Sequence, residues 1–113
     1  DLGQKKNCVI IGRCADYILR DQPKVLRLFV YADHETCVKN VTELYGLVPK
    51  EAEERISSID RTRAAYYKYY TGCDWTDVNN YDLCLNTGKI GFEKAVDAIL
   101  AYMKTVGLLP AEL

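Results

Sequence analysis

Three short apolar runs along the chain predict β-strands, at about residues 7–12, 25–32 and 81–86. Each run is dominated by apolar residues and contains β-branched or aromatic side chains. Runs of this kind are typical of strands that are covered on both faces, as in a parallel sheet. The pattern therefore indicates a buried sheet and favours an α/β fold.

Three longer segments with helical periodicity are expected at about residues 34–45, 49–70 and 91–106. Asp33 is a favourable N-cap for the first helix, and Gly46 would end it. Pro49 suits the first position of the second helix. The last helix is expected to bury a stripe formed by Phe92, Ala95, Val96, Ile99, Leu100 and Met103. The order β, β, α, α, β, α predicts one α/β domain over residues 1–113.

The long central helix ends in an unusual sequence, IDRTRAAYYKYYTG, which gathers two arginines and four tyrosines. Its expected inward stripe consists of Ala52, Ile56, Ile59, Tyr66 and Tyr70. Helical spacing places Arg63 on this stripe, between Ile59 and Tyr66. Arg63 therefore either extends to solvent or pairs with an acid, or it faces a cleft that holds an anion. Arg61 lies about 160° around the helix from Arg63, so the two could straddle a ligand. The stripe tyrosines are expected to pack, not to stack on a base.

Charge and composition limit the possible partners. The formal net charge is -1, with 49% hydrophobic and 27% charged residues, which is ordinary for a soluble globular domain. A nucleic-acid-binding domain would usually be strongly basic, so any anion site is expected to be local. No apolar run is long enough to span a membrane, and no membrane partner is expected.

The five cysteines are odd in number, widely spaced and without a C-x-x-C pair. Reduced, structural thiols in a cytoplasmic protein are therefore expected in preference to disulfides or a zinc site. The one histidine, His34, stands beside an expected helix start and is interpreted as a surface residue.

A second candidate site follows the first expected strand, where the sequence reads Gly12-Arg13-Cys14-Ala15-Asp16. Ligands of open α/β sheets bind at the carboxyl ends of the strands, and an arginine there points into that crevice. A guanidinium also matches phosphate oxygens two at a time. Alone, this pattern is weak evidence for a phosphate site.

Together, the segments CVIIGRCADYIL, LRLFVYAD, IDRTRAAYYKYYTG and DWTDVNNYDLCLNTGKIGFEKAVDAI resemble the cytidylate kinase-like family of P-loop nucleoside monophosphate kinases. The resemblance runs from Asn7 to Met103 and covers the carboxyl-terminal part of a full-length member. It implies a three-layer P-loop kinase-like fold, here incomplete. It also implies transfer of a phosphoryl group from ATP to CMP, giving ADP and CDP, with Mg²⁺ as the metal.

The resemblance also implies roles for particular residues. Arg13 matches an arginine that meets the acceptor nucleotide. Cys14 replaces the family's adjacent acid, and Asp16 stands two positions on as a candidate substrate-binding residue. The D-R-x-R pattern of the helix implies a phosphate clamp formed by Asp60, Arg61 and Arg63. The loop after the last strand resembles a segment that lies against the donor's adenine, formed by Asn86, Thr87 and Lys89.

The sequence contains no G-x-x-x-x-G-K-[ST] motif, because Gly88-Lys89 is followed by Ile90 and has no upstream partner glycine. This loop cradles the ATP phosphates and helps hold Mg²⁺ in P-loop enzymes. The chain alone is therefore expected to be inactive as a kinase. In the family the missing central strand would lie between the strands expected at 7–12 and 25–32. An upstream segment, another chain or a second copy filling the gap is expected, or else a rearranged sheet; the upstream segment is favoured.

Two other functions remain open from the sequence. The chain could be a non-catalytic nucleotide- or phosphate-binding module that retains the acceptor-side arginines. It could also bind single-stranded nucleic acid through the Arg/Tyr segment. The near-neutral charge makes the second alternative the weaker one.

Overall fold

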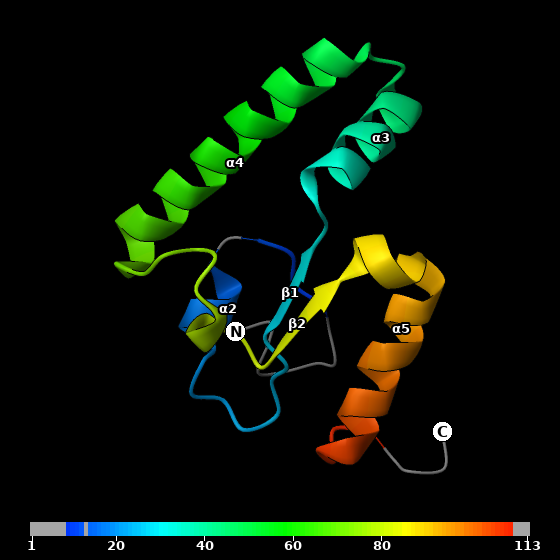
Figure 1. Cartoon of the computed structure of the whole chain (residues 1–113). Coiled ribbons are helices and arrows are strands. Elements are labelled where there is room, and N and C mark those ends of the chain that lie inside the picture. The colour runs from blue at the N-terminus through cyan, green and yellow to red at the C-terminus, as the bar shows by residue number, and fades with distance from the viewer. Residues whose placement is uncertain (1–8, 13, 110–113) are drawn as a thin grey trace.

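The computed structural model describes residues 9–12 and 14–109, which form a small α/β domain with two parallel strands and four α-helices. The elements are α2 (Ala15–Ile18), β1 (Leu28–Tyr31), α3 (His34–Tyr45), α4 (Pro49–Thr71), the 3₁₀ helix η1 (Val78–Asn80), β2 (Leu83–Asn86) and α5 (Thr87–Thr105). In Figure 1, α5 lies on one side of the two strands and α2 on the other. No helix in this part of the chain is long and apolar enough to cross a membrane.

The sheet consists of β1 and β2, which pair in parallel from Leu28 opposite Leu83 to Tyr31 opposite Asn86. The strands expected at 25–32 and 81–86 are therefore confirmed, with shorter bounds. Arg27 and Asp82, which directly precede the two strands, are also in contact. The Arg27 amide donates to the Asp82 carboxylate at 2.8 Å, and the Arg27 guanidinium lies 3.4 Å from the same carboxylate.

The prediction of a strand at 7–12 is wrong for the residues that the structure describes. Residues 9–12 belong to no strand, and the side chains of Val9 and Ile11 are 90% and 89% exposed. Residues 7 and 8 lie outside the described range. The physical reason is the absence of a neighbour: a strand exists only where another strand satisfies its backbone groups. Within the described part, β1 pairs with β2 and with no other strand.

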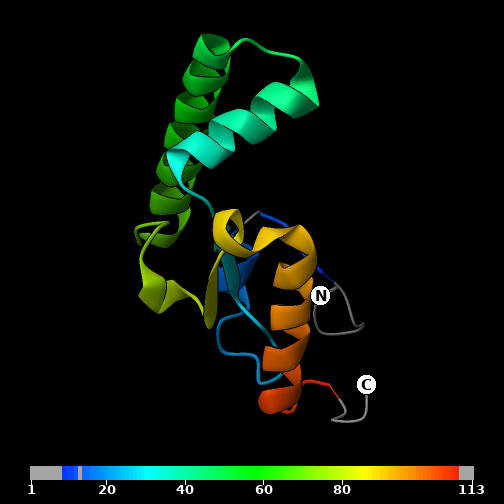
Figure 2. The ribbon, with the colours of Figure 1, turned by 45° about the vertical axis from the view of Figure 1, so that its right-hand side comes forward.

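The helices α3 and α4 form an antiparallel hairpin that stands away from the sheet (Figure 2). The bounds of α3 are those predicted, and α4 extends one residue beyond prediction. The Asp33 carboxylate caps α3 by accepting hydrogen bonds from the Thr36 amide and hydroxyl, at 3.3 and 2.6 Å. Gly46 ends α3 in the left-handed conformation, with φ of 65°. Ala52, fully buried in the second helix, allows the two helices to approach.

The helix α5 begins four residues before its predicted start at Gly91. The Asn86 side chain accepts a hydrogen bond from the Gly88 amide at 3.0 Å and so caps an extra first turn. Gly91 then adopts a non-helical conformation, with φ of 78°, and makes a kink. The expected apolar stripe is confirmed only in part. Ala95 is buried and Ile99 and Met103 are half-buried, whereas Phe92, Val96 and Leu100 are exposed.

Gly88 lies where the start of α5 approaches the end of β1. A Cβ atom at this position would lie 3.0 Å from Asp33 Oδ1 and 3.2 Å from both Ala32 Cβ and Asn86 Oδ1. Two of these atoms belong to capping side chains that are held by their own hydrogen bonds, so they cannot move aside freely.

We therefore expect Gly88→Ala to lower the free energy of unfolding by about 1–3 kcal/mol, as overpacking does. At an unobstructed helical site the same change usually adds about 0.5–1 kcal/mol. Urea unfolding measures the difference, with Lys94→Ala on the exposed side of α5 as the control. A variant at least as stable as the wild type would contradict the close approach.

Candidate functional site

The face of α4 that turns toward the rest of the domain is defined by Tyr67, which is only 5% exposed. The predicted inward stripe is wrong at this end of the helix, because Tyr66 and Tyr70 are exposed. Arg63 precedes Tyr67 by four residues and therefore lies on the same face. The predicted stripe is not confirmed at Arg63 either, because its side chain is solvent-exposed, although its backbone position lies on the same face as Tyr67.

The exposed tyrosines of α4 contact one another. The rings of Tyr66 and Tyr70 have centroids 4.6 Å apart, and those of Tyr69 and Tyr70 are 4.9 Å apart. Their packing partners are therefore neighbouring rings on the solvent side, not the interior.

An aromatic wall lies between β1 and the loop after α4, and it consists of Phe29, Tyr31, Trp75 and Tyr81. The Phe29 ring stacks on Tyr81 at 4.9 Å and on Tyr31 at 5.9 Å, and meets Trp75 edge-on at 5.5 Å. The Tyr81 hydroxyl donates to the Trp75 carbonyl at 2.6 Å and ties the loop to the wall.

Arg63 is the charged group beside this wall. Its Cζ atom lies 6.0 Å from the centroid of the Trp75 ring, at the outer limit of a cation–π contact. In the part of the chain that the structure describes, Arg63 forms no ion pair. The Arg63 guanidinium is therefore exposed and unpaired within the described residues, next to the half-buried Trp75 ring.

The other members of the D-R-x-R pattern face elsewhere. The Arg61 Nε atom donates to the Ser57 carbonyl of its own helix at 3.3 Å, so this exposed side chain lies back along α4. Asp60 lies near Cys37 of α3: burial first, and then the Asp60 and Asp33 carboxylates, raise the pKa of the Cys37 thiol. The structure thus brings Arg63, but neither Asp60 nor Arg61, to the aromatic wall.

The segment that carries the second candidate site is tied to α4. The Tyr67 hydroxyl donates a hydrogen bond of 2.7 Å to the Asp16 carboxylate in α2. Cys14 just before α2 is buried and adopts the left-handed conformation, with φ of 55°. Arg13 lies outside the described residues, so its distance from Arg63 stays untested.

Burial raises the pKa values of Tyr67 and Tyr81. Burial, together with the hydrogen bond to Asp16, raises the pKa of Tyr67 well above its ordinary value. Burial and the nearby Asp16 charge raise the pKa of Tyr81 to about 12. A raised folded-state pKa contributes stability that is complete below the unfolded value of 10 and is lost as the pH rises toward 12.

We therefore expect the free energy of unfolding to fall as the pH rises from roughly 9 to 11, and to fall less steeply in Tyr81→Phe. Phenylalanine keeps the ring in the wall and removes the titrating group. Urea unfolding at several pH values measures both slopes. Identical slopes in the two proteins would show that Tyr81 is not shifted by folding.

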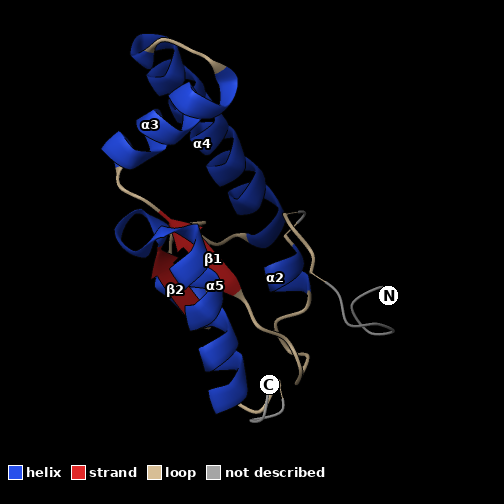
Figure 3. Cartoon of the chain, turned by 90° about the vertical axis from the view of Figure 1, so that its right-hand side faces the viewer, coloured by secondary structure: helices blue, strands red, loops and turns tan. Residues whose placement is uncertain are grey.

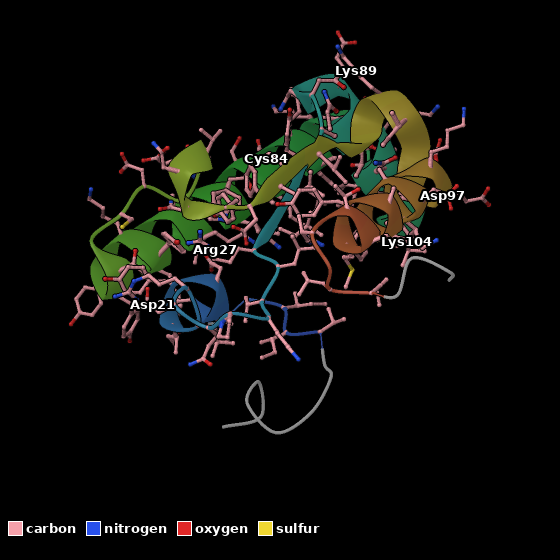
Figure 4. The ribbon with its side chains drawn as sticks, turned by 90° about the horizontal axis from the view of Figure 1, so that it is seen from below. Asp21, Arg27, Cys84, Lys89, Asp97 and Lys104 are labelled. Atoms are coloured by element: carbon pink, nitrogen blue, oxygen red, sulfur yellow. The ribbon has the colours of Figure 1, made fainter. Side chains whose placement is uncertain are left out.

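The predicted adenine-side residues lie at the carboxyl ends of the strands, but two of them have structural roles. Asn86 caps α5, and the Thr87 hydroxyl donates to the Tyr31 carbonyl at 3.2 Å, which joins α5 to β1. The Lys89 side chain lies at the margin of the molecule (Figure 4). His34, interpreted as a surface residue, is exposed and lies 3.6 Å from Glu53.

The described part of the chain shows no ready-made site for a metal ion or for the ATP phosphates. Residues 9–12 and 14–109 contain no group of three His, Cys, Asp or Glu side chains that could hold a metal ion. The sequence also has no glycine-rich loop ending in Lys-Ser or Lys-Thr to cradle the phosphates. The cysteines Cys14, Cys37, Cys73 and Cys84 are free thiols.

Tyr67 and the aromatic wall are not among the residues predicted from the sequence. The sequence does indicate that Tyr67 shares a helix face with Arg63, because it lies one helical turn after it. No sequence pattern indicates Trp75 and Tyr81, because both lie in the segment between α4 and β2, where no periodicity relates them to Phe29. Such residues meet only through the tertiary fold.

The sequence and the fold are similar to those of known proteins. A profile of the cytidylate kinase-like family matches residues 1–89. A crystal structure of an uncharacterized protein from Eubacterium ventriosum ATCC 27560 superposes with a TM-score of 0.86 at 34% sequence identity, over 91% of this chain. This chain spans 57% of the length of that protein. No curated protein matches the sequence. Because the family profile covers most of the sequence, the chain belongs to the cytidylate kinase-like family.

Proposed function

We propose that this protein is a nucleoside monophosphate kinase that transfers a phosphoryl group from ATP to CMP, giving ADP and CDP. The observation that carries the proposal is the family match over residues 1–89. That segment contains α4 with its arginines and the aromatic wall, so the matched part includes the candidate site and not only the scaffold.

The position of Arg63 supports a role on the acceptor side. Phosphoryl transfer depends on positioning and on neutralising the charge of the phosphate oxygens, and a guanidinium does both through paired hydrogen bonds. Arg63 carries a free guanidinium beside planar side chains. It would stabilise the transferring phosphate electrostatically, without donating or accepting a proton.

The remaining acceptor contacts are assigned by the family resemblance. Arg13 would meet the acceptor nucleotide from the turn before α2. Arg61 would reach the phosphate only after its side chain leaves the Ser57 carbonyl. Asn86, Thr87 and Lys89 remain candidates for the donor side, and Asn86 and Thr87 also hold the start of α5 through side-chain hydrogen bonds.

The donor side needs groups that these 113 residues lack. We therefore propose that residues 1–113 alone do not turn over ATP. The length comparison supports this proposal, because the chain spans 57% of the length of the related protein.

The test is an assay of CDP formation from CMP and ATP, with Mg²⁺, by the protein at its full natural length. The proposal expects CDP to form with the full-length protein and none with residues 1–113. Calorimetric binding of CMP is measured in parallel. If the full-length protein binds CMP and forms no CDP, a non-catalytic nucleotide-binding module replaces the kinase.

A further inference from the structure

Three tyrosines on the solvent side of α4 form a patch that the described residues leave uncovered. The side chains of Tyr66, Tyr69 and Tyr70 are 43%, 82% and 62% exposed. The ring centroids of Tyr66 and Tyr69 lie 4.6 and 4.9 Å from that of Tyr70. Figure 3 shows α2 beside this end of α4, where Asp16 of α2 accepts a hydrogen bond from the buried Tyr67. The three rings of the tyrosine patch therefore remain open to solvent.

A contiguous group of exposed rings is not typical of a helix face that meets only water. Solvated helix faces consist mainly of charged and small polar side chains, whereas large rings gain stability from burial. Contiguous exposed apolar surface marks a site of interaction. Tyrosine suits such a site because its ring is flat and apolar and its hydroxyl stays hydrated. The tyrosine patch therefore indicates a planar partner.

The charge of that partner follows from Arg63. Arg63 precedes Tyr66 by three residues and Tyr70 by seven, so the three side chains start within about 60° of one another around the helix. The Arg63 side chain is exposed and forms no ion pair within the described residues. A guanidinium at one end of an aromatic surface favours a ligand that is anionic at one end and planar at the other.

The spacing along α4 matches a nucleotide. Tyr66 and Tyr70 lie about 5 and 10 Å beyond Arg63 along the axis, because each residue advances the helix by about 1.5 Å. Within a nucleoside monophosphate, the ribose separates the phosphate from the base by a comparable distance. A phosphate bound to the Arg63 guanidinium can therefore place its base against the rings of Tyr66 and Tyr70.

We propose that Tyr66 and Tyr70 form a stacking subsite for the base of the nucleotide whose phosphate Arg63 binds. Tyr69 lies about 120° around the helix from Arg63, so it supports the Tyr70 ring edge-on and does not touch the base. This inference rests on the proposed function and adds the base to the phosphate contact. Stacking uses the flat face that every base has, so the subsite contributes affinity without choosing among bases.

Leucine variants test the subsite. Tyr66→Leu and Tyr70→Leu remove the rings and keep an apolar side chain that favours a helix. Tyr69→Leu is the matched control, because Tyr69 contacts Tyr70 and is turned away from Arg63. All three side chains are exposed, so each variant is expected to fold as the wild type does.

The experiment is calorimetric titration of the full natural-length protein with CMP, UMP and ribose 5-phosphate, which carries the phosphate and lacks the base. We expect Tyr66→Leu and Tyr70→Leu each to weaken CMP binding about tenfold, as the loss of a stacking ring does, and UMP binding by a similar factor. Ribose 5-phosphate is expected to bind both variants within about twofold of the wild type. Tyr69→Leu is expected to bind all three ligands within about twofold of the wild type.

The outcomes separate this inference from the proposed function. If the wild type binds neither CMP nor ribose 5-phosphate, the proposed function fails, and the subsite fails with it. If the wild type binds CMP and both tyrosine variants bind it equally well, the subsite is wrong and the proposed function stands. Equal losses for CMP and ribose 5-phosphate also overturn the subsite, because the tyrosines would then act on the phosphate contact. If the variants weaken binding of a single-stranded oligonucleotide and leave CMP binding unchanged, the tyrosine patch is a nucleic-acid surface and the inference is wrong.

Discussion

Replacing Arg63 with alanine is expected to lower kcat/KM for CMP phosphorylation by about 10²-fold or more, which is typical of removing one group that stabilises transition-state charge. Arg63 is the arginine of α4 that lies beside the aromatic wall. Arg63→Lys is expected to recover only part of the loss, because an ammonium carries the charge but cannot bind two phosphate oxygens in the same plane.

Two arginines of the same helix serve as comparisons for that loss. Arg55→Ala, on an exposed part of α4, is expected to leave kcat/KM unchanged. Arg61→Ala is expected to cost less than Arg63→Ala, because the Arg61 Nε atom already donates to Ser57. Steady-state kinetics of the full natural-length protein measures all three variants. If Arg61→Ala costs more than Arg63→Ala, the assignment of the phosphate contact to Arg63 is wrong.

Replacing Phe29 with alanine is expected to have the largest effect on stability, a loss of about 3 kcal/mol in the free energy of unfolding. The Phe29 ring contacts Tyr31, Tyr81 and Trp75 at once, so its removal takes an aromatic contact away from each of these three rings. Each aromatic pair adds about 0.5–1.5 kcal/mol of stability beyond burial. Phe29 is only half-buried, so the expected loss lies at the lower end of the usual range for Phe→Ala.

The matched control for this change is Phe92→Ala on α5, where the ring is 68% exposed. Its loss is expected to stay below about 1 kcal/mol. Urea unfolding followed by fluorescence is suitable, since Trp75 belongs to the wall and reports on it directly. Equal losses at Phe29 and Phe92 would mean that the aromatic wall does not hold the domain together.

The helices could be predicted from the sequence because their ends are encoded locally. Asp33 and Gly46 bound α3 through contacts within a few residues, and Pro49 and Gly72 do the same for α4. The start of α5 was placed one turn late, because Gly91 suggested a boundary where the chain only kinks. Capping by the Asn86 side chain decided the true start.

The first strand could not be predicted reliably because strand formation is not local. The run from Val9 to Ile11 has the composition of a buried strand and lies exposed in the structure. Its apolar side chains agree with the expectation that a further strand belongs between this run and β1, whose second edge pairs with no strand among the described residues. That expectation stays a prediction.

The sequence identifies the arginines and tyrosines of the candidate site, but it does not show which of them face the rest of the domain. From Arg63, Tyr66 lies about 60° around the helix in one direction and Tyr67 about 40° in the other, so periodicity alone allows either to face inward. The arrival of Asp16 at Tyr67 decides between them. No pattern in the sequence relates two residues that are 51 positions apart.

The most direct measurement compares the affinities of CMP and cytidine for the full natural-length wild type and for Arg63→Ala, by calorimetry. If Arg63 meets the acceptor phosphate, the wild type binds CMP at least about tenfold more tightly than cytidine, and Arg63→Ala removes most of that difference. Equal affinity of the wild type for both ligands, or a preference for CMP that survives in Arg63→Ala, would contradict a phosphate site on this face of α4.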